Sequence, residues 1–409
     1  MPELLSPAGN PEKLYAAVRY GADAVYLAGQ RFGMRAAAAN FTMPELCEGV
    51  AYAHAHGVRA YVTVNTSPRT QEYADLATYL EELRAAAPDA LIVGDLGVLS
   101  LVRRILPEMP IHISTQANVV SAETAQAYAA LGATRIVLSR ELSLAEVKAI
   151  RAALPREVEL ECFVHGAMCV SYSGRCLLSN YLSGRDACRG ACTQPCRWQY
   201  RVASVDAVLY EEKRPNEPIP VHEEGGESFF MSSRDLCMID HIPELCEAGV
   251  ASFKIEGRMK SAYYTAVVTN AYRMAIDNYC AGHRTPDPRL RAEVESVSHR
   301  EYDTGFFFDD PHGRAMITER DGYLREKAYL GRVVAYNSTT GVALVEQKNK
   351  ISAGDTVELL IPGRVGVPFT VDELWDEMGA TISCAPHPGM RFMLRVPLPV
   401  SEGDLLRGV

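Results

Sequence analysis

Short apolar runs alternate with longer amphipathic segments over the first 285 residues of the chain. The runs are rich in β-branched residues and several follow a Gly or Pro, as is typical of buried parallel strands. The predicted strands are residues 3–6, 24–28, 58–64, 90–93, 111–114, 135–138, 159–163 and 252–256. Because most are followed by a helical segment, the pattern predicts an α/β fold with a (β/α)8 TIM-like barrel. A doubly wound open sheet is the alternative, since a count of strands does not show closure.

The amphipathic segments predict helices, and two of them begin with a capping box. Thr42 stands three residues before Glu45, and Ser143 stands three residues before Glu146. At this spacing each side chain can bond the backbone N–H of the other residue. The predicted helices are residues 11–20, 43–56, 71–86, 122–131, 142–153 and 259–280. The last of them would close the barrel.

A long insertion, at about residues 163–250, separates the seventh predicted strand from the eighth. Insertions after barrel strands line the catalytic face. Within the insertion, residues 211–227 are polar and contain Pro and Gly, which indicates a loop or an exposed hairpin.

After residue 325 the chain changes to segments in which apolar and polar positions tend to alternate, separated by turns with Asn, Gly or Pro. These segments are residues 331–336, 341–347, 356–361, 366–371 and 390–396. Such a pattern is typical of a small all-β module. We therefore expect a catalytic domain over residues 1–325 and a barrel-like β domain over residues 326–409.

The composition is that of a globular protein: 48% of the 409 residues are hydrophobic and 22% are charged, which excludes a disordered or fibrous chain. The formal net charge of −10 argues against general binding to nucleic acid, unless basic residues are concentrated locally. No apolar run approaches the ~20 residues of a membrane helix. The start of the chain lacks the pattern of an export signal. We expect a cytoplasmic protein with no membrane partner.

Cysteine is unusually abundant, and eight of the eleven cysteines lie between Cys162 and Cys246. In a large cytosolic protein such a group indicates a metal site or catalysis rather than disulfides. Six residues separate Cys169 from Cys176, and Cys188, Cys192 and Cys196 are spaced by four. Thiolates from separate loops favour an iron–sulfur cluster, whereas structural zinc typically uses tighter knuckles. The remaining cysteines that we expect in the apolar core are Cys47, Cys162, Cys246, Cys280 and Cys384.

The segment from Glu161 to Ser179, with His165-Gly166-Ala167-Met168-Cys169 at its centre, resembles the signature of the U32 peptidase (collagenase-like) family. Further resemblance covers residues 5–9, 21–26, 254–258 and 348–350. Residues 185–198 are most similar to the branch of this family that converts the wobble uridine of tRNA to 5-hydroxyuridine.

The resemblance implies an oxygen-independent hydroxylase whose [4Fe–4S] cluster is bound by Cys169, Cys176, Cys192 and Cys196. It also implies tRNA as a partner and prephenate, a small dicarboxylate, as the source of the hydroxyl oxygen; it identifies no electron donor. Other relatives hydroxylate ribosomal RNA or the ubiquinone ring. This chain has Cys188 where the branch usually has Asn, and Cys237 is a candidate substitute for the fourth ligand.

Peptide hydrolysis is the alternative that the family name suggests. It would need an activated nucleophile and a base within reach, yet the chain has neither a Gly-x-Ser-x-Gly elbow nor a His-Glu-x-x-His zinc helix. A pair of His165 with Cys169 would be the candidate for this chemistry. The other interpretation of His165 is that it packs beside the cluster.

Polar residues at the carboxyl ends of the predicted strands are the remaining site candidates, because barrels build their active sites there. The candidates for catalysis are Asn65, Asp95, His165 and Glu256. The candidates for substrate binding are Arg35, Gln116, Arg140, Lys254 and Arg258. A dicarboxylate favours paired guanidiniums, for which we select Arg35, Arg140 and Arg258. Any of these side chains could instead cap the barrel through a structural bond.

Basic charge is concentrated in the insertion, where residues 175–201 contain five arginines and one acidic residue. Tyr181, Trp198 and Tyr200 are interleaved with the arginines. Arginines contact phosphates and aromatic rings stack on unpaired bases, so Arg175 and Arg197 are candidates for binding RNA. The alternative is that the arginines offset the charge of the cluster.

Overall fold

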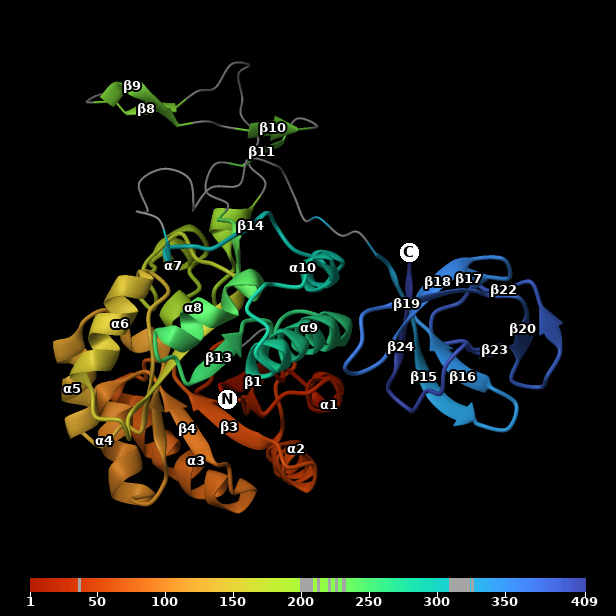
Figure 1. The fold of residues 1–409 in the computed structure, drawn as a ribbon. Helices are drawn as coiled ribbons and strands as arrows, with labels where there is room; N and C mark the ends of the chain where they lie inside the picture. The colour runs from red at the N-terminus through yellow and green to blue at the C-terminus, as the bar shows by residue number, and fades with distance from the viewer. Residues whose placement is uncertain are drawn as a thin grey trace.

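The computed structural model describes residues 1–35, 38–198, 233–308, 324 and 327–409, and the backbone of short strands between residues 209 and 229. In these ranges eight parallel strands form a barrel surrounded by helices (Figure 1). The barrel strands are β1 (Glu3–Pro7), β2 (Ala24–Leu27), β3 (Arg59–Val64), β4 (Ala90–Val93), β5 (Ile111–Ile113), β6 (Arg135–Val137), β7 (Glu159–Ala167) and β13 (Ser252–Ile255). Strand β13 pairs with both β1 and β7. The sheet is therefore closed: the predicted barrel is confirmed, and the open-sheet alternative is wrong.

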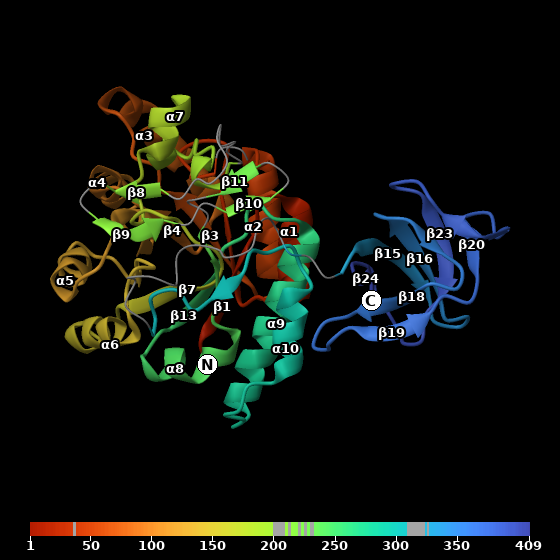
Figure 2. The ribbon, with the colours of Figure 1, turned by 90° about the horizontal axis from the view of Figure 1, so that it is seen from above.

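Most of the helices that cover the barrel begin at a side-chain cap, whereas α3 and α8 begin without one. They include α1 (Pro11–Arg19), α2 (Met43–Ala55), α3 (Tyr73–Ala86), α4 (Leu96–Ile105), α5 (Ala122–Ala130), α6 (Leu144–Ala153), α8 (Ile242–Glu247) and α9 (Ala262–Cys280). Both predicted capping boxes are present, at Thr42 with Glu45 and at Ser143 with Glu146. Seen from above, the helices surround the strands (Figure 2).

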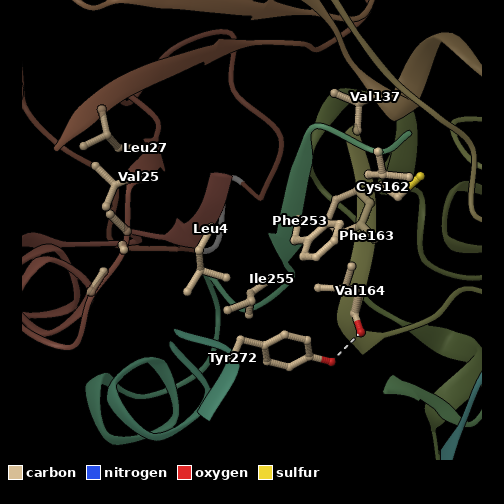
Figure 3. Packing of buried hydrophobic residues seen from close by; sticks show 14 of the residues in the cluster. Leu4, Val25, Leu27, Val137, Cys162, Phe163, Val164, Phe253, Ile255 and Tyr272 are labelled. Carbon is tan, nitrogen blue, oxygen red and sulfur yellow. Dashed lines mark hydrogen bonds between the residues drawn. The ribbon is translucent and has the colours of Figure 1, made fainter. Parts of the chain in front are cut away.

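Alternate residues of the strands pack into different layers. Leu4 and Val25 belong to the large cluster shown in Figure 3, whereas the next residues, Leu5 and Tyr26, belong to a separate small cluster. This is the two-residue period expected of strands with one face toward the helices and the other inside the barrel. In the large cluster, Tyr272 of α9 donates a hydrogen bond to the carbonyl oxygen of Val164 at 2.7 Å (Figure 3).

Strand β7 is longer than the sequence predicts, because its last residues pair outside the barrel. His165 to Ala167 pair in antiparallel fashion with β12 (Asp235–Cys237), which in turn pairs with β14 (Tyr302–Asp303). Within the insertion, β8 (Leu209–Glu211) and β9 (Arg214–Ile219) form one antiparallel pair, and β10 (His222–Glu224) and β11 (Glu227–Phe229) form another. Of the loop and the exposed hairpin that the sequence left open here, the strand pairs favour the hairpin, and its exposure stays a prediction.

The C-terminal domain is an antiparallel half-barrel with its own core around Val333, Val345 and Phe392. Its main sheet runs in the order β19 (Val367–Thr370), β18 (Thr356–Leu360), β24 (Leu405–Gly408), β15 (Tyr329–Asn337), β16 (Val342–Gln347), β23 (Arg391–Arg395), β20 (Leu374–Asp376) and β21 (Thr381–Ile382). The five predicted strands are confirmed. The boundary between residues 325 and 326 falls outside the described residues and stays a prediction.

Buried charge fixes the β domain against the barrel, beside α9 and α10 (Pro288–Glu295) (Figures 1 and 2). Arg407 is 1% exposed, and it pairs with Glu293 of α10 and with Glu358 of its own domain, each at 2.7 Å. Its Nη1 also donates to Ser296 Oγ at 3.0 Å. A buried guanidinium with this many partners has one favourable position, so the two domains have a defined relative orientation. None of the helices in the described ranges is long and apolar enough to cross a membrane.

Candidate functional site

A cavity of about 640 Å³ lies where the rim of the barrel, the insertion and the C-terminal domain meet. Cys169 reaches it just after β7, and Glu256 reaches it directly after β13. These two strands are neighbours in the barrel, so their carboxyl ends place both residues at one edge. The insertion adds Cys192, Cys196 and other residues to the same lining. The cavity has the volume of a typical small-molecule site.

Three of the four predicted cluster ligands face this cavity: Cys169, Cys192 and Cys196. Cys176 is not part of the described lining, and its carbonyl oxygen lies 3.8 Å from Sγ of Cys188. As the side chains stand, no three His, Cys, Asp or Glu residues of the described ranges are arranged to bind a metal ion. Three of the predicted ligands thus line one cavity without surrounding a common centre, and the cluster site stays a prediction.

Donors of hydrogen bonds surround the cavity thiols. Nη2 of Arg140 lies 3.6 Å from Sγ of Cys169, and the backbone N–H of Gln194 donates to Sγ of Cys192 at 3.3 Å. Burial alone would raise the pKa of Cys169, but the guanidiniums of Arg140, Arg35 and Arg197 outweigh it and lower that pKa. Positive charge and N–H···S bonds stabilise thiolates, which are the form that binds iron.

Arg35 and Glu256 form an ion pair at the cavity, with Nη2 and Oε1 3.5 Å apart. Burial would raise the pKa of Glu256, but Arg35 and Arg140 lower it, so this carboxylate is charged at neutral pH. Of the three arginines selected for a dicarboxylate, only Arg35 belongs to the lining. Arg140 and Arg258 bond the carbonyl oxygens of Ala167 and Met34 instead.

Arg197 also lines the cavity, and its Nη2 donates to the carbonyl oxygen of Met168 at 2.9 Å. Arg175, its partner in the predicted RNA-binding group, is exposed and absent from the described lining. Lys254 points into the barrel, where its Nζ lies 2.7 Å from Oε1 of Glu161 and over the ring of Tyr26. The lysine is thus part of a buried ion network rather than of the cavity.

Several strand-end candidates have structural partners away from the cavity. Oδ1 of Asp95 caps α4 by accepting hydrogen bonds from the N–H groups of Gly97 and Val98, at 2.8 and 3.1 Å. Asn65 bridges the N–H of Met34 and the hydroxyl of Ser114. Gln116 lies in a short 3-10 turn, Thr115–Ala117. None of these three belongs to the described lining. The hydrogen bonds of Asp95 and Asn65 indicate structural roles for both residues.

His165 is buried between tyrosines and is not brought to Cys169. Its Nδ1 lies 3.3 Å from the hydroxyl of Tyr272, and its Nε2 lies 3.1 Å from the hydroxyl of Tyr302. Burial lowers the pKa of His165 to about 3, so the ring is neutral. Cys237, opposite His165 on β12, is also buried and bonds Tyr272. The geometry favours a packing role for both residues.

The cavity is also lined by residues that were not among the polar residues selected at the carboxyl ends of the strands. Lys260 and Tyr264 follow β13, and Nζ of Lys260 donates to the carbonyl oxygen of Ser298 at 2.9 Å. Burial lowers the pKa of Lys260 to about 8. Tyr329 and Asn349 belong to the C-terminal domain. The only sequence signal for Asn349 was its place in the segment of residues 348–350 that resembles the U32 family.

The expectation for the core cysteines is confirmed for Cys162, which is 3% exposed, and Cys47 and Cys246 pack against the same core cluster. It is wrong for Cys280, which is exposed at the end of α9. Cys47, Cys246 and Cys384 are half-buried. Apolar neighbours in sequence do not show whether a residue faces the core or the end of a helix.

The closed barrel, the thiol-lined cavity at its carboxyl edge and the β half-barrel beside it define a class of two-domain barrel proteins with a cysteine-rich insertion. Residues 9–317 match Peptidase family U32, and residues 325–407 match the Peptidase family U32 C-terminal domain. The chain belongs to peptidase family U32, as its motifs predict.

Several relatives match almost the whole chain, and three of them illustrate the range of names. The chain is 37% identical to "tRNA hydroxylation protein P1" of Bacillus subtilis, over 99% of this chain and 94% of the relative. It is 38% identical to "tRNA hydroxylation protein P" of Escherichia coli, over 97% and 94%. It is 31% identical to "Collagenase" of Porphyromonas gingivalis, over 99% and 97%. Relatives with the same domains thus carry names of two different activities.

Proposed function

We propose that this protein hydroxylates C5 of the wobble uridine of tRNA without molecular oxygen, in the cytoplasm. The observation that carries the proposal is the group of three thiols, Cys169, Cys192 and Cys196, that faces one cavity beside Arg35, Arg197 and Glu256. The two relatives named for tRNA hydroxylation support tRNA as the substrate.

A [4Fe–4S] cluster fits the donor set of this cavity. Cys169, Cys192 and Cys196 would bind three irons, and we assign the fourth to Cys176. The fit rests on thiols from two separate loops and on the N–H groups of Arg140 and Gln194 directed at two of the sulfurs. A bound cluster would supply a Lewis acid for the oxygen donor or a relay for electrons.

The remaining side chains of the cavity suit an anionic oxygen donor such as prephenate. The guanidiniums of Arg35 and Arg197 line the cavity and would bind carboxylates. Glu256 holds Arg35 in place through their ion pair. Arg140 and Arg258 lie behind the lining and orient the backbone through carbonyl oxygens.

The test combines nucleoside analysis with iron analysis. In a strain that lacks the gene, 5-hydroxyuridine derivatives should disappear from tRNA, and the wild-type gene should restore them while Cys169→Ala does not. Protein purified without oxygen should contain iron and sulfide. Unchanged tRNA nucleosides in the deletion strain would contradict the function, and an iron-free, colourless protein after reconstitution would contradict the cluster.

Proteolysis is the second candidate, because one relative is named a collagenase. It would require turnover of a defined peptide by cluster-free protein, abolished by Cys169→Ala or His165→Ala. The hydrogen bonds of His165 to Tyr272 and Tyr302 favour the hydroxylase, since they leave this histidine without contact to Cys169.

A further inference from the structure

The C-terminal domain forms one wall of the cavity that contains the thiols. Tyr329, the first residue of β15, and Asn349, in the turn after β16, line the cavity together with Cys169 and Glu256. The two sets of residues come from different domains, whose orientation is defined by the buried pairs of Arg407. The cavity is therefore incomplete without the β domain.

The carboxamide of Asn349 is held in place before any substrate binds. Its Nδ2 donates to the carbonyl oxygen of Tyr329 at 2.6 Å, and its backbone N–H donates to the carbonyl oxygen of Leu330 at 3.1 Å. The ring of Tyr329 stacks on Tyr263 of α9, with centroids 5.1 Å apart and planes 4° from parallel. The turn is thus bonded to strand β15, which in turn packs on helix α9 of the barrel domain through Tyr329.

The anchored amide presents a donor and an acceptor. A primary amide carries two N–H groups and one carbonyl oxygen, so the bond to Tyr329 leaves Oδ1 and the second N–H of Asn349 for a ligand. Uracil has an N–H donor at N3 between two carbonyl acceptors, which complements an amide edge. Proteins read unpaired bases of RNA through such edge contacts, and Asn349 is exposed on the cavity side.

We infer that Asn349 is a specificity-determining residue that pairs with the N3 edge of the target uracil, and that the C-terminal domain is part of the substrate site. This inference rests on the proposed tRNA hydroxylation. It assigns to the β domain a direct contact with the base, in the same cavity as the cluster thiols.

The first test compares Asn349→Ala with Asn337→Ala in otherwise intact holoenzyme. Asn337 is a matched control, because it is an exposed Asn of the same domain at the far end of β15 and bonds only a turn. We expect Asn349→Ala to lower kcat/KM on tRNA about tenfold or more, as loss of a bidentate base contact does. Asn337→Ala should stay within about twofold, with iron content equal in all three proteins.

A second readout separates base recognition from a structural role. The enzyme is assayed on tRNA transcripts with uridine or cytidine at the target position. Asn349→Ala should lower the ratio of kcat/KM for uridine to kcat/KM for cytidine. In wild-type protein, 4-thiouridine at the target position should photo-crosslink to the peptide that contains Asn349. An active wild-type enzyme with no such crosslink, or with unchanged kinetics and base preference in Asn349→Ala, would overturn the inference. Wild-type enzyme inactive on every tRNA would overturn the proposed function itself.

Discussion

Arg140 joins the end of a barrel strand to a cavity thiol: its Nη1 donates to the carbonyl oxygen of Ala167 at 2.6 Å, and its Nη2 lies 3.6 Å from Sγ of Cys169. The guanidinium also lies over the ring of Phe163, 5.1 Å from the centroid. One side chain thus orients the loop that carries Cys169 and compensates the charge of its thiolate. Its importance for the cluster can be measured.

Arg140→Ala should weaken binding of the cluster about tenfold or more, the usual effect of removing a side chain that orients a metal ligand. The measurement is iron per chain after anaerobic reconstitution and the rate of iron loss to a chelator. Arg104→Ala, at an exposed position in the last turn of α4, is the matched control and should behave as wild type. Equal rates of iron loss in all three proteins would contradict the role of Arg140.

The fourth cluster ligand can be decided between Cys176 and Cys237. Cys237 is 1% exposed and bonds Tyr272, so Cys237→Ser should keep the iron content and the EPR spectrum of wild type. Cys176→Ser should give less iron and an altered EPR spectrum, because one iron would lose its thiolate. The reverse result would assign the ligand to Cys237. Cys188→Ser tests the neighbouring thiol and should keep the cluster.

The charged network inside the barrel should be important for stability. Arg135 is 2% exposed and pairs with Glu3 at 2.6 Å and with Glu161 at 3.1 Å. Arg135→Met removes the guanidinium that these two buried carboxylates share, and the loss of one partner of a buried ion pair costs about 3–5 kcal/mol. Urea denaturation measures this loss in the free energy of unfolding.

The control for this variant is Arg31→Met, because Arg31 pairs with Asp75 at the surface. Exposed pairs contribute about 0–1 kcal/mol, so the control should unfold close to the wild-type midpoint. If both variants lose the same stability, the buried network has no special role.

The pH dependence of stability should reveal the buried His165. Burial lowers its pKa to about 3, whereas a histidine in the unfolded chain titrates near 6.5. Below pH 6.5 the unfolded chain binds a proton that the folded protein excludes, so the free energy of unfolding falls as the pH falls. The slope is about 1.4 kcal/mol per pH unit, or about 2 kcal/mol by pH 5.

Unfolding of wild type and His165→Gln at several pH values between 5 and 7 measures this contribution. Between pH 7 and pH 5 the free energy of unfolding of the variant should fall by about 2 kcal/mol less than that of wild type, whatever its absolute stability. His387→Gln, at an exposed position, should keep the wild-type slope. Parallel curves for wild type and His165→Gln would contradict a neutral, buried His165.

The barrel was predictable because buried parallel strands are contiguous apolar runs, and all eight runs became strands. Position along a strand was less informative about the site. Asp95 and Glu256 both follow a strand, yet Asp95 caps α4 and Glu256 faces the cavity. A position after a strand places a residue at the edge of the barrel. The direction of its side chain depends on which backbone N–H groups or charges lie nearby.

The sequence by itself determined the barrel, the β domain, the U32 family motifs and the group of cysteines, because each depends on local periodicity or on residues near one another in the chain. Only the tertiary structure decided that β13 closes the sheet, that Cys169, Cys192 and Cys196 share a cavity without Cys176, and that Asn349 completes the wall. These relations depend on strand pairing and domain docking between residues distant in sequence. Such contacts follow from the packing of the whole chain, so no local pattern specifies them.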